Sequence, residues 1–205
     1  MFKLSNVLIF SLVIAASFAV VVAWRFAFFV LPFSWTGESA RLAELLRVRP
    51  GVTVADVGAG DGAMALEMAQ LVGPNGVVYA TELSSEQRQA MTRKILEAAT
   101  SHVRVVEGAT DATRLPDDCC DAIYLRAVTH HLADRDQFAA EIFKAVRPGG
   151  RVVVIDFAPG ALWFHGADHG VTPHHVRRAF ESAGFKTAGQ IENWGGGMFA
   201  MVFEP

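Results

Sequence analysis

The chain has 205 residues, of which 52% are hydrophobic and 19% are charged, a composition that fits one folded domain with an attached segment. Its formal net charge is −3 and it contains no run of Lys and Arg, which argues against a nucleic-acid partner. The two cysteines, Cys119 and Cys120, are adjacent, and adjacent cysteines rarely close a disulfide. We therefore expect two thiols at a strand edge, with no disulfide framework and no zinc site.

The N-terminal segment is strongly apolar. Residues 4–24 carry no charged side chain over 21 residues, and a helix of that length crosses about 30 Å of hydrocarbon. Aromatic side chains gather near its far end, as at a membrane interface: Trp24, Phe26, Phe28, Phe29, Phe33 and Trp35. These features predict a transmembrane helix, so that residues 1–35 form a membrane anchor and linker.

A cleaved secretory signal peptide is the alternative interpretation of this segment. Signal peptides have an apolar core of about 7 to 15 residues and small residues at the cleavage site, whereas this core is longer and ends in bulky side chains. On the far side of the segment lie Arg25, Arg41, Arg47 and Arg49, against Lys3 and the amino terminus on the near side. This imbalance favours a cytoplasmic domain, with a secreted or periplasmic domain as the alternative.

Strand and helix patterns alternate after the linker. A helical pattern over residues 38–48 ends at Pro50 and Gly51. Apolar runs then predict strands at 52–57, 77–81, 103–107, 122–125 and 151–156, with helical segments between them. This alternation of strands and helices predicts a doubly wound, mostly parallel α/β sheet over residues 36–205. Two strand-like runs around residues 195–197 predict an antiparallel hairpin that closes the sheet.

A glycine-rich turn follows the first predicted strand, in the sequence VADVGAGDG. Ligands of open α/β sheets lie beyond the carboxyl ends of the strands, where Gly58, Gly60 and Gly62 are expected. Glycines let the backbone turn tightly and let a ligand lie against the main chain, and the helix predicted at 63–72 offers free N–H groups. An ordinary turn with structural glycines would look similar, so this motif alone is weak evidence.

Glu82 strengthens the prediction of a ligand site. It ends the second predicted strand, 26 positions after Asp56. A carboxylate there can accept hydrogen bonds from both hydroxyls of a ribose. NAD and S-adenosylmethionine both carry a ribose, so Glu82 does not separate these two cofactors.

The fifth predicted strand suggests a family. RPGGRVVVID, at 147–156, together with the closing hairpin, resembles the class I S-adenosylmethionine-dependent methyltransferases. Three further segments agree in order with that family's motifs: VADVGAGDG, VYATEL and DATRLPDDCCDAIYL. The resemblance covers residues 42–203. It implies a Rossmann-like sheet, S-adenosylmethionine as cofactor, and methyl transfer to a small-molecule acceptor.

The resemblance also implies residue roles. Asp56 would steady the glycine loop and the methionine amino group, while Glu82 would bind the ribose. Leu83 would pack on the adenine, and Asp111 would accept a hydrogen bond from the adenine amino group. Relatives often have Gly-Asp-Ala directly after the third strand, whereas this chain has GATDA, with Ala109 in the place of the acid. The complete predicted cofactor-binding set is Asp56, Gly58, Ala59, Gly60, Gly62, Glu82, Leu83, Asp111, Ala112 and Arg126.

The sequence leaves the methyl acceptor open. A thiolate, amine or carbanion acceptor needs mainly positioning, but a hydroxyl or phenol needs a base with a near-neutral pKa. Titratable residues near the ends of the fourth and fifth strands are His130, His131, Asp156, His165 and His169, of which His131, His165 and His169 are the candidate catalytic residues. A structural His131 that hydrogen-bonds the backbone is the competing interpretation, and it is favoured because THHLAD resembles a segment of methyltransferases with many substrates.

The insertion at 158–172 is the expected lid over the acceptor. Its Trp163 and Phe164, beside a membrane anchor, favour a hydrophobic small acceptor, although both side chains could simply pack on the domain. His165, Asp168 and His169 could ligate a metal, but without a partner cluster no metal site is predicted. The alternative function is a catalytically silent Rossmann-like binding domain, which would be exported if the N-terminal segment is a signal peptide. The intact glycines and Glu82 argue against it.

Overall fold

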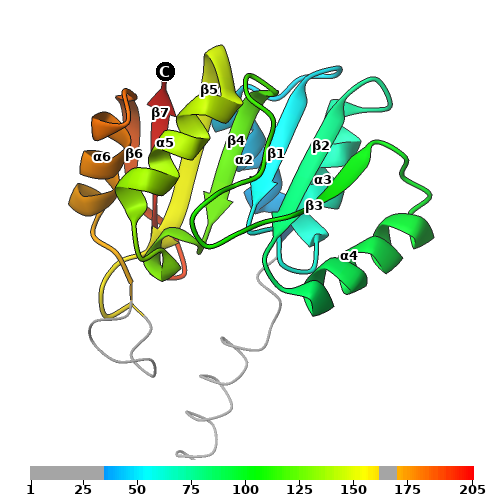
Figure 1. Cartoon of the computed structure of the whole chain (residues 1–205), viewed down its shortest axis with the longest axis horizontal. Helices are drawn as coiled ribbons and strands as arrows, with labels where there is room; N and C mark the ends of the chain where they lie inside the picture. The colour runs from blue at the N-terminus through cyan, green and yellow to red at the C-terminus, as the bar shows by residue number, and fades with distance from the viewer. Residues whose placement is uncertain (1–34, 162–169) are drawn as a thin grey trace, which may run out of the picture. The chain divides into compact units, whose positions relative to one another are not determined.

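Strands pair into one mixed sheet in the computed structural model, which describes residues 35–161 and 170–205 (Figure 1). The seven-stranded order is β3-β2-β1-β4-β5-β7-β6. The strands are β1 (Thr53–Val57), β2 (Val77–Glu82), β3 (Val103–Glu107), β4 (Cys120–Arg126), β5 (Val146–Phe157), β6 (Lys186–Gly195) and β7 (Met198–Glu204). Strands β1 to β5 run parallel to one another, and β7 runs antiparallel to both β5 and β6. The predicted parallel sheet and closing hairpin are both confirmed.

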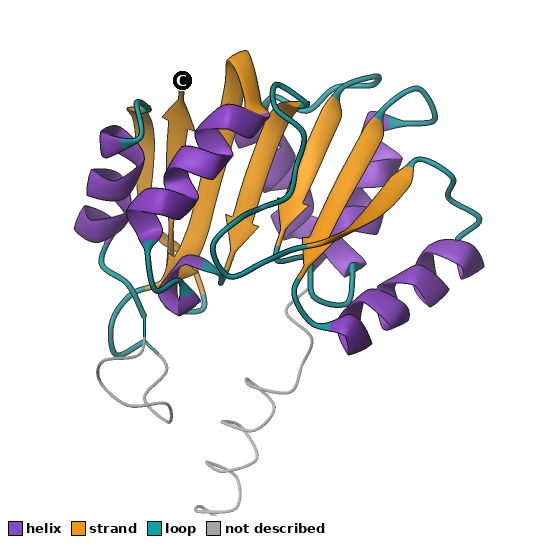
Figure 2. Ribbon diagram, viewed as in Figure 1, coloured by secondary structure: helices purple, strands orange, loops and turns teal. Residues whose placement is uncertain are grey.

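Helices cover both faces of the sheet (Figure 2). They are α2 (Trp35–Leu46), α3 (Ala63–Val72), α4 (Ser85–Glu97), the short 3-10 helix η1 (Thr129–His131), α5 (Arg135–Ala145) and α6 (Pro173–Ser182). One core packs apolar side chains of α2, α3 and α4 against the sheet, and the other packs those of α5 and α6. Burial of alternate strand residues on opposite faces therefore produces the doubly wound arrangement that the sequence predicts.

The winding of the chain reverses at β1. From β1 the chain moves outward through β2 to β3, and then returns to β4 on the other side of β1. The carboxyl ends of β1 and β4 consequently border the crevice where doubly wound sheets bind ligands. This places the glycine-rich turn after β1 at the expected point.

The start of β5 differs from its prediction. The strand begins at Val146, directly after α5, rather than at Arg151. Val146 pairs with Cys120, and the register then shifts before Ala122 pairs with Arg151. The Pro-Gly-Gly segment is thus an irregularity within an extended strand, not a loop in front of it.

The expectation of two free thiols is wrong. Cys119 and Cys120 are joined in a disulfide, and both side chains are buried. In a regular strand adjacent side chains point to opposite faces, which keeps two sulfur atoms apart. Cys119 instead precedes β4, which begins at Cys120, so this geometry does not apply to the pair.

Two predicted segments lie outside the described residues. The transmembrane helix falls within residues 1–34, and Trp163, Phe164, His165, Asp168 and His169 fall within residues 162–169. Within 35–161 and 170–205, none of the helices combines the length and apolar character needed to cross a bilayer. The division at residue 35 stays a prediction.

Candidate cofactor site

The glycine loop between β1 and α3 adopts a backbone that other residues would strain. Gly58 has a φ of +76°, and a Cβ built on it would lie 2.5 Å from Cγ2 of Val128. Gly62 has a φ of +78°, and its Cβ would overlap the Met91 side chain. Both positions require glycine because left-handed backbone and close contact coincide there.

The loop is attached to the end of β2 by hydrogen bonds. The N–H groups of Gly58 and Ala59 donate to the carbonyl of Thr81, at 2.9 and 2.8 Å. The N–H of Gly60 donates to Oε2 of Glu82 at 2.8 Å. A Cβ on Gly60 would meet nothing within 4 Å, so the loop presents bare main chain at its centre.

Glu82 accepts hydrogen bonds from two backbone segments while keeping acceptor capacity. Its Oε1 accepts from the N–H of Ser84 at 2.8 Å, in addition to the bond from Gly60 to Oε2. Each carboxylate oxygen has a second lone pair, so both can still accept from the two hydroxyls of a ribose. Leu83 beside it is 57% exposed, which suits an apolar side chain that packs on a flat ring. The arrangement fits the predicted ribose and adenine roles.

Arg88 supports this turn and was missed by sequence reasoning. Its guanidinium donates to the carbonyl oxygens of Glu82 and Leu83, at 3.0 and 2.6 Å, and pairs with Glu107 at 3.4 Å. It therefore fixes the backbone that carries Glu82. No sequence signal distinguishes Arg88 from the other polar residues of α4.

Asp111 and Ala112 lie in the loop between β3 and β4. This loop starts against β2, because Gly108 donates to the carbonyl of Glu82 at 3.1 Å. Ala109 then donates to the carbonyl of Ala112 at 3.0 Å. The Asp111 side chain is exposed, at the same sheet edge as Glu82. The structure thus brings the predicted adenine loop next to the predicted ribose acid.

Asp56 lies beneath the crevice rather than within it. Asp56 is 3% exposed, and it pairs in register with Tyr124 of β4. Burial raises the pKa of Asp56 to about 7, although the Tyr124 hydroxyl and the Arg126 guanidinium oppose this rise. A carboxyl group with a pKa near 7 can take up or release a proton at physiological pH.

Arg126, a predicted cofactor-binding residue, forms an ion pair in this structure. Its Nε and Nη2 donate to the two oxygens of Glu38 on α2, at 2.9 and 3.2 Å. Nε1 of Trp194 donates to the same carboxylate at 2.7 Å, and the Arg41 guanidinium lies 4.0 Å over the Trp194 ring. The cluster joins α2, β4 and β6. Sequence reasoning missed Glu38 and Trp194.

An acid–histidine pair lies at the ends of β4 and β5. Nδ1 of His130 donates to Oδ1 of Asp156 at 2.6 Å, and the Thr129 hydroxyl bonds Oδ2. Burial raises the pKa of Asp156, but the hydrogen bonds from His130 and Thr129 outweigh it and hold the pKa below its usual value. His131, the predicted candidate, is exposed, and its ring centroid lies 3.9 Å from that of His130. The histidine held by a carboxylate is therefore His130.

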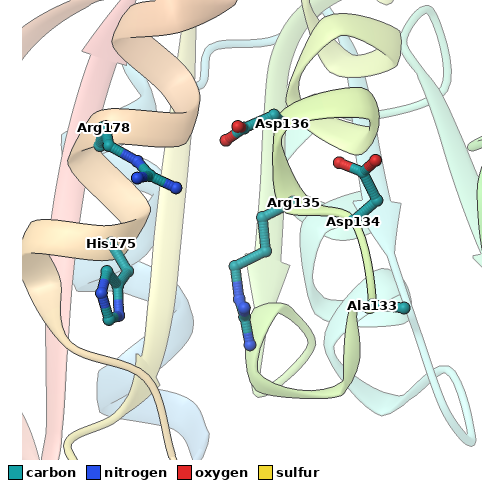
Figure 3. A pocket seen from close by; sticks show the side chains of 6 residues that line it. All are labelled: Ala133, Asp134, Arg135, Asp136, His175 and Arg178. Carbon is teal, nitrogen blue, oxygen red and sulfur yellow. The ribbon is translucent and has the colours of Figure 1, made fainter.

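A pocket of about 230 Å³ opens between the first turns of α5 and α6 (Figure 3). It is lined by Ala133, Asp134, Arg135, Asp136, His175 and Arg178. Charges of both signs face it, and the predicted cofactor residues are not among its lining. Arg135 also donates to the carbonyl of Thr129 at 2.8 Å, so one wall of the pocket supports the turn that carries His130.

Known proteins resemble large parts of this chain. Residues 55–154, from β1 into β5, match a family model described as a methyltransferase domain. The ubiquinone/menaquinone biosynthesis C-methyltransferase UbiE of Hahella chejuensis is 28% identical over 112 residues, which cover 54% of this chain and 45% of that protein. The demethylmenaquinone methyltransferase of Listeria monocytogenes is 27% identical over 128 residues, 62% of this chain and 53% of that protein. The chain thus spans about half the length of the curated relatives it matches.

Solved structures share the fold. A SAM-dependent methyltransferase from Aquifex aeolicus superimposes with a TM-score of 0.69 at 23% identity, covering 80% of this chain and 88% of that one. Geranyl diphosphate C-methyltransferase from Streptomyces coelicolor, solved with S-adenosyl-L-homocysteine, gives 0.70 at 15% identity, covering 82% and 78%. With the glycine loop and Glu82 in place, the chain belongs to the class I S-adenosylmethionine-dependent methyltransferases, and S-adenosylmethionine is its cofactor.

Proposed function

We propose that the chain transfers a methyl group from S-adenosylmethionine to a small, hydrophobic, aromatic acceptor. The observation that carries the transfer is the glycine loop bonded to Glu82, because it joins a bare main-chain surface to a ribose-binding carboxylate. The aromatic acceptor is supported by the relatives, which are named for ubiquinone and menaquinone biosynthesis and for demethylmenaquinone.

Each residue of the crevice would have its own role in binding the cofactor. Glu82 would bind the ribose, Leu83 would cover the adenine, and ionised Asp56 would attract the methionine ammonium. The bound cofactor supplies an electrophilic methyl group on a sulfonium. Because Glu82 and the glycine loop occupy the β1 and β2 side of the crevice, the acceptor would enter from the side of β4 and β5.

Calorimetry and an activity assay on the full-length chain in mild detergent test this proposal. We expect binding of S-adenosylhomocysteine but not of NAD, and methylation of 1,4-dihydroxynaphthalene, a reduced quinone ring, detected by mass spectrometry. An NAD isotherm without a response to S-adenosylhomocysteine would contradict the cofactor site. Binding without transfer to this probe or to amine, thiol and alkyl alcohol probes would favour the catalytically silent domain.

We further propose that residues 1–35 anchor the methyltransferase domain, residues 36–205, to the cytoplasmic face of a membrane. Support comes from the uncharged stretch at 4–24 and from the arginines that follow it. S-adenosylmethionine is made in the cytoplasm, which favours the same side. A reporter that is active only in the cytoplasm, fused after Pro205, should be active. Activity of an export-dependent reporter at that place would instead favour the signal peptide.

A further inference from the structure

Asp156 is a buried carboxylate that its neighbours hold in the ionised state. The residue is 0% exposed, at the carboxyl end of β5. Oδ1 accepts from Nδ1 of His130 at 2.6 Å and from the N–H of Phe157 at 2.7 Å. Oδ2 accepts from the Thr129 hydroxyl and from the N–H of His130 at 3.1 Å. A buried charge is retained only when such donors surround it.

This arrangement sets the tautomer of His130. Since Nδ1 donates to a carboxylate, the proton of the neutral imidazole resides on Nδ1 and the basic lone pair on Nε2. The side chain is 4% exposed, so packing holds the ring in one orientation. A histidine oriented by a buried carboxylate in this way is suited to accept a proton at Nε2.

His130 also lies on the side of the crevice that the cofactor residues leave open. Glu82 ends β2 and the glycine loop follows β1. His130 follows β4 and Asp156 lies at the end of β5, beyond the point where the winding reverses. Val128, two residues before His130, borders the loop so closely that a Cβ on Gly58 would lie 2.5 Å from it. The acid–histidine pair therefore adjoins the loop from the direction of the acceptor.

We propose that His130 is the general base that takes a proton from the methyl acceptor, with Asp156 as its positioning residue. This inference rests on the proposed function and deepens it, because it restricts the acceptor to a nucleophile that carries a removable proton, such as a phenol or hydroquinone. An acceptor that reacts without losing a proton to a base, such as a thiolate, would not use the pair.

The proposed step balances for a hydroquinone. Nε2 takes the hydroxyl proton, and the phenolate electrons form a bond between the ring carbon and the methyl carbon. The S–CH₃ bond breaks, and its electron pair returns to sulfur. The ring C–H proton then leaves to solvent, and protonated His130 returns its proton to the oxygen, so that the net reaction releases one proton. Among the described residues, the charged or titratable groups beside His130 include Asp156, the tilted ring of His131 and, through the Thr129 carbonyl, Arg135.

Replacement of His130 by Asn tests the inference in the full-length chain with 1,4-dihydroxynaphthalene as acceptor. Asn keeps an N–H donor for Asp156 but has no basic nitrogen. We expect kcat to fall by about 10² to 10⁴, the usual contribution of a general base, and the acidic limb of the kcat–pH profile to disappear. The affinity for S-adenosylhomocysteine and the melting temperature should stay close to those of the wild type. His174→Ala, an exposed histidine at the start of α6, is the matched control and should change neither rate nor profile.

Three results would overturn the inference. His130→Asn could keep its rate within threefold of the wild type, His131→Ala could remove the acidic limb instead, or the wild type could methylate an amine or thiol probe but not the hydroquinone. The last result would leave methyl transfer intact and reject only the base.

A measurement independent of activity separates this inference from failure of the proposed function. In protein with ¹⁵N-labelled histidine, the ring of His130 should show the Nδ1–H tautomer, and Asp156→Asn should abolish that preference. If no probe is methylated, this spectrum decides: the Nδ1–H tautomer supports a base at Nε2, and a proton on Nε2 at pH 8 overturns it.

Discussion

The carboxylate of Glu82 accepts a hydrogen bond from the backbone N–H of Gly60 at 2.8 Å, which joins the end of β2 to the centre of the glycine loop. Its second oxygen accepts from Ser84 at the start of α4. One side chain thus orders the loop and also offers acceptors to a ribose. Glu82 is for this reason a structural residue of the loop, and its proposed ribose contact adds a binding role.

Glu82→Gln should weaken binding of S-adenosylmethionine by about tenfold to a hundredfold, since hydrogen bonds to a charged group contribute about 1.5 to 3 kcal/mol. The new amide NH₂ cannot accept from Gly60 or Ser84, so the free energy of unfolding should also fall by about 1 to 2 kcal/mol. Calorimetry and urea unfolding measure the two effects. Glu86→Gln, at an exposed acid in the first turn of α4, serves as control, and unchanged affinity in Glu82→Gln would reject the ribose role.

The stability of the ligand-free chain should fall as the pH rises from about 4 to about 7. Asp56 keeps its proton in the folded state up to a pKa of about 7, whereas the unfolded side chain loses it near 3.8. The folded state therefore binds more protons in this window, and the loss amounts to at most about 4 kcal/mol. Urea unfolding should give a lower free energy of unfolding at pH 8 than at pH 5, and Asp56→Asn should remove most of this difference. The lowered pKa of Asp156 acts with the opposite sign, in a more acidic range.

Binding of S-adenosylhomocysteine should tighten by about tenfold between pH 6 and pH 8, because a protonated Asp56 cannot attract the methionine ammonium and its pKa is about 7. Binding near pH 6 should release a proton. Calorimetry in two buffers with different ionisation enthalpies counts that proton. Affinity that does not change with pH would show that Asp56 does not interact with the ammonium group.

Gly58→Ala should destabilise the fold by about 2 to 5 kcal/mol. The left-handed backbone costs a residue with a Cβ about 1 to 2 kcal/mol, and the contact of 2.5 Å with Val128 adds an overpacking cost of about 1 to 3 kcal/mol. Gly51→Ala is the matched control, because Gly51 has a φ of +89° and its Cβ would meet nothing within 4 Å. Equal effects of the two substitutions on urea unfolding would exclude a contribution from Val128.

Glu38→Gln should lower the free energy of unfolding by about 2 to 3 kcal/mol. The change removes the charge that Arg126 and Trp194 share, at a site where the Glu38 side chain is 10% exposed and that of Arg126 18%. Glu141→Gln, which breaks the more exposed pair with Lys144, should lower the free energy of unfolding much less, because solvent screens that pair. Urea unfolding of both variants compares the pairs, and a similar small loss in each would show that the Glu38 cluster does not hold α2.

The order of strands and helices could be predicted because hydrophobic periodicity is a local property of the chain. The glycine turn and Glu82 were also predictable, since both directly follow strands and parallel strands bring their carboxyl ends to one edge. The sequence by itself therefore determined the fold class and the side of the crevice formed by β1 and β2.

Tertiary structure alone decided which side chains meet. Arg126 pairs with Glu38 across 88 positions and Trp194 reaches Glu38 across 156, separations over which no periodic pattern carries information. His130 and His131 are equivalent in sequence, but only the packing of η1 against the end of β5 turns His130 toward Asp156 and leaves His131 exposed. The physical reason is that side-chain direction in a short turn depends on contacts made after the sheet has assembled.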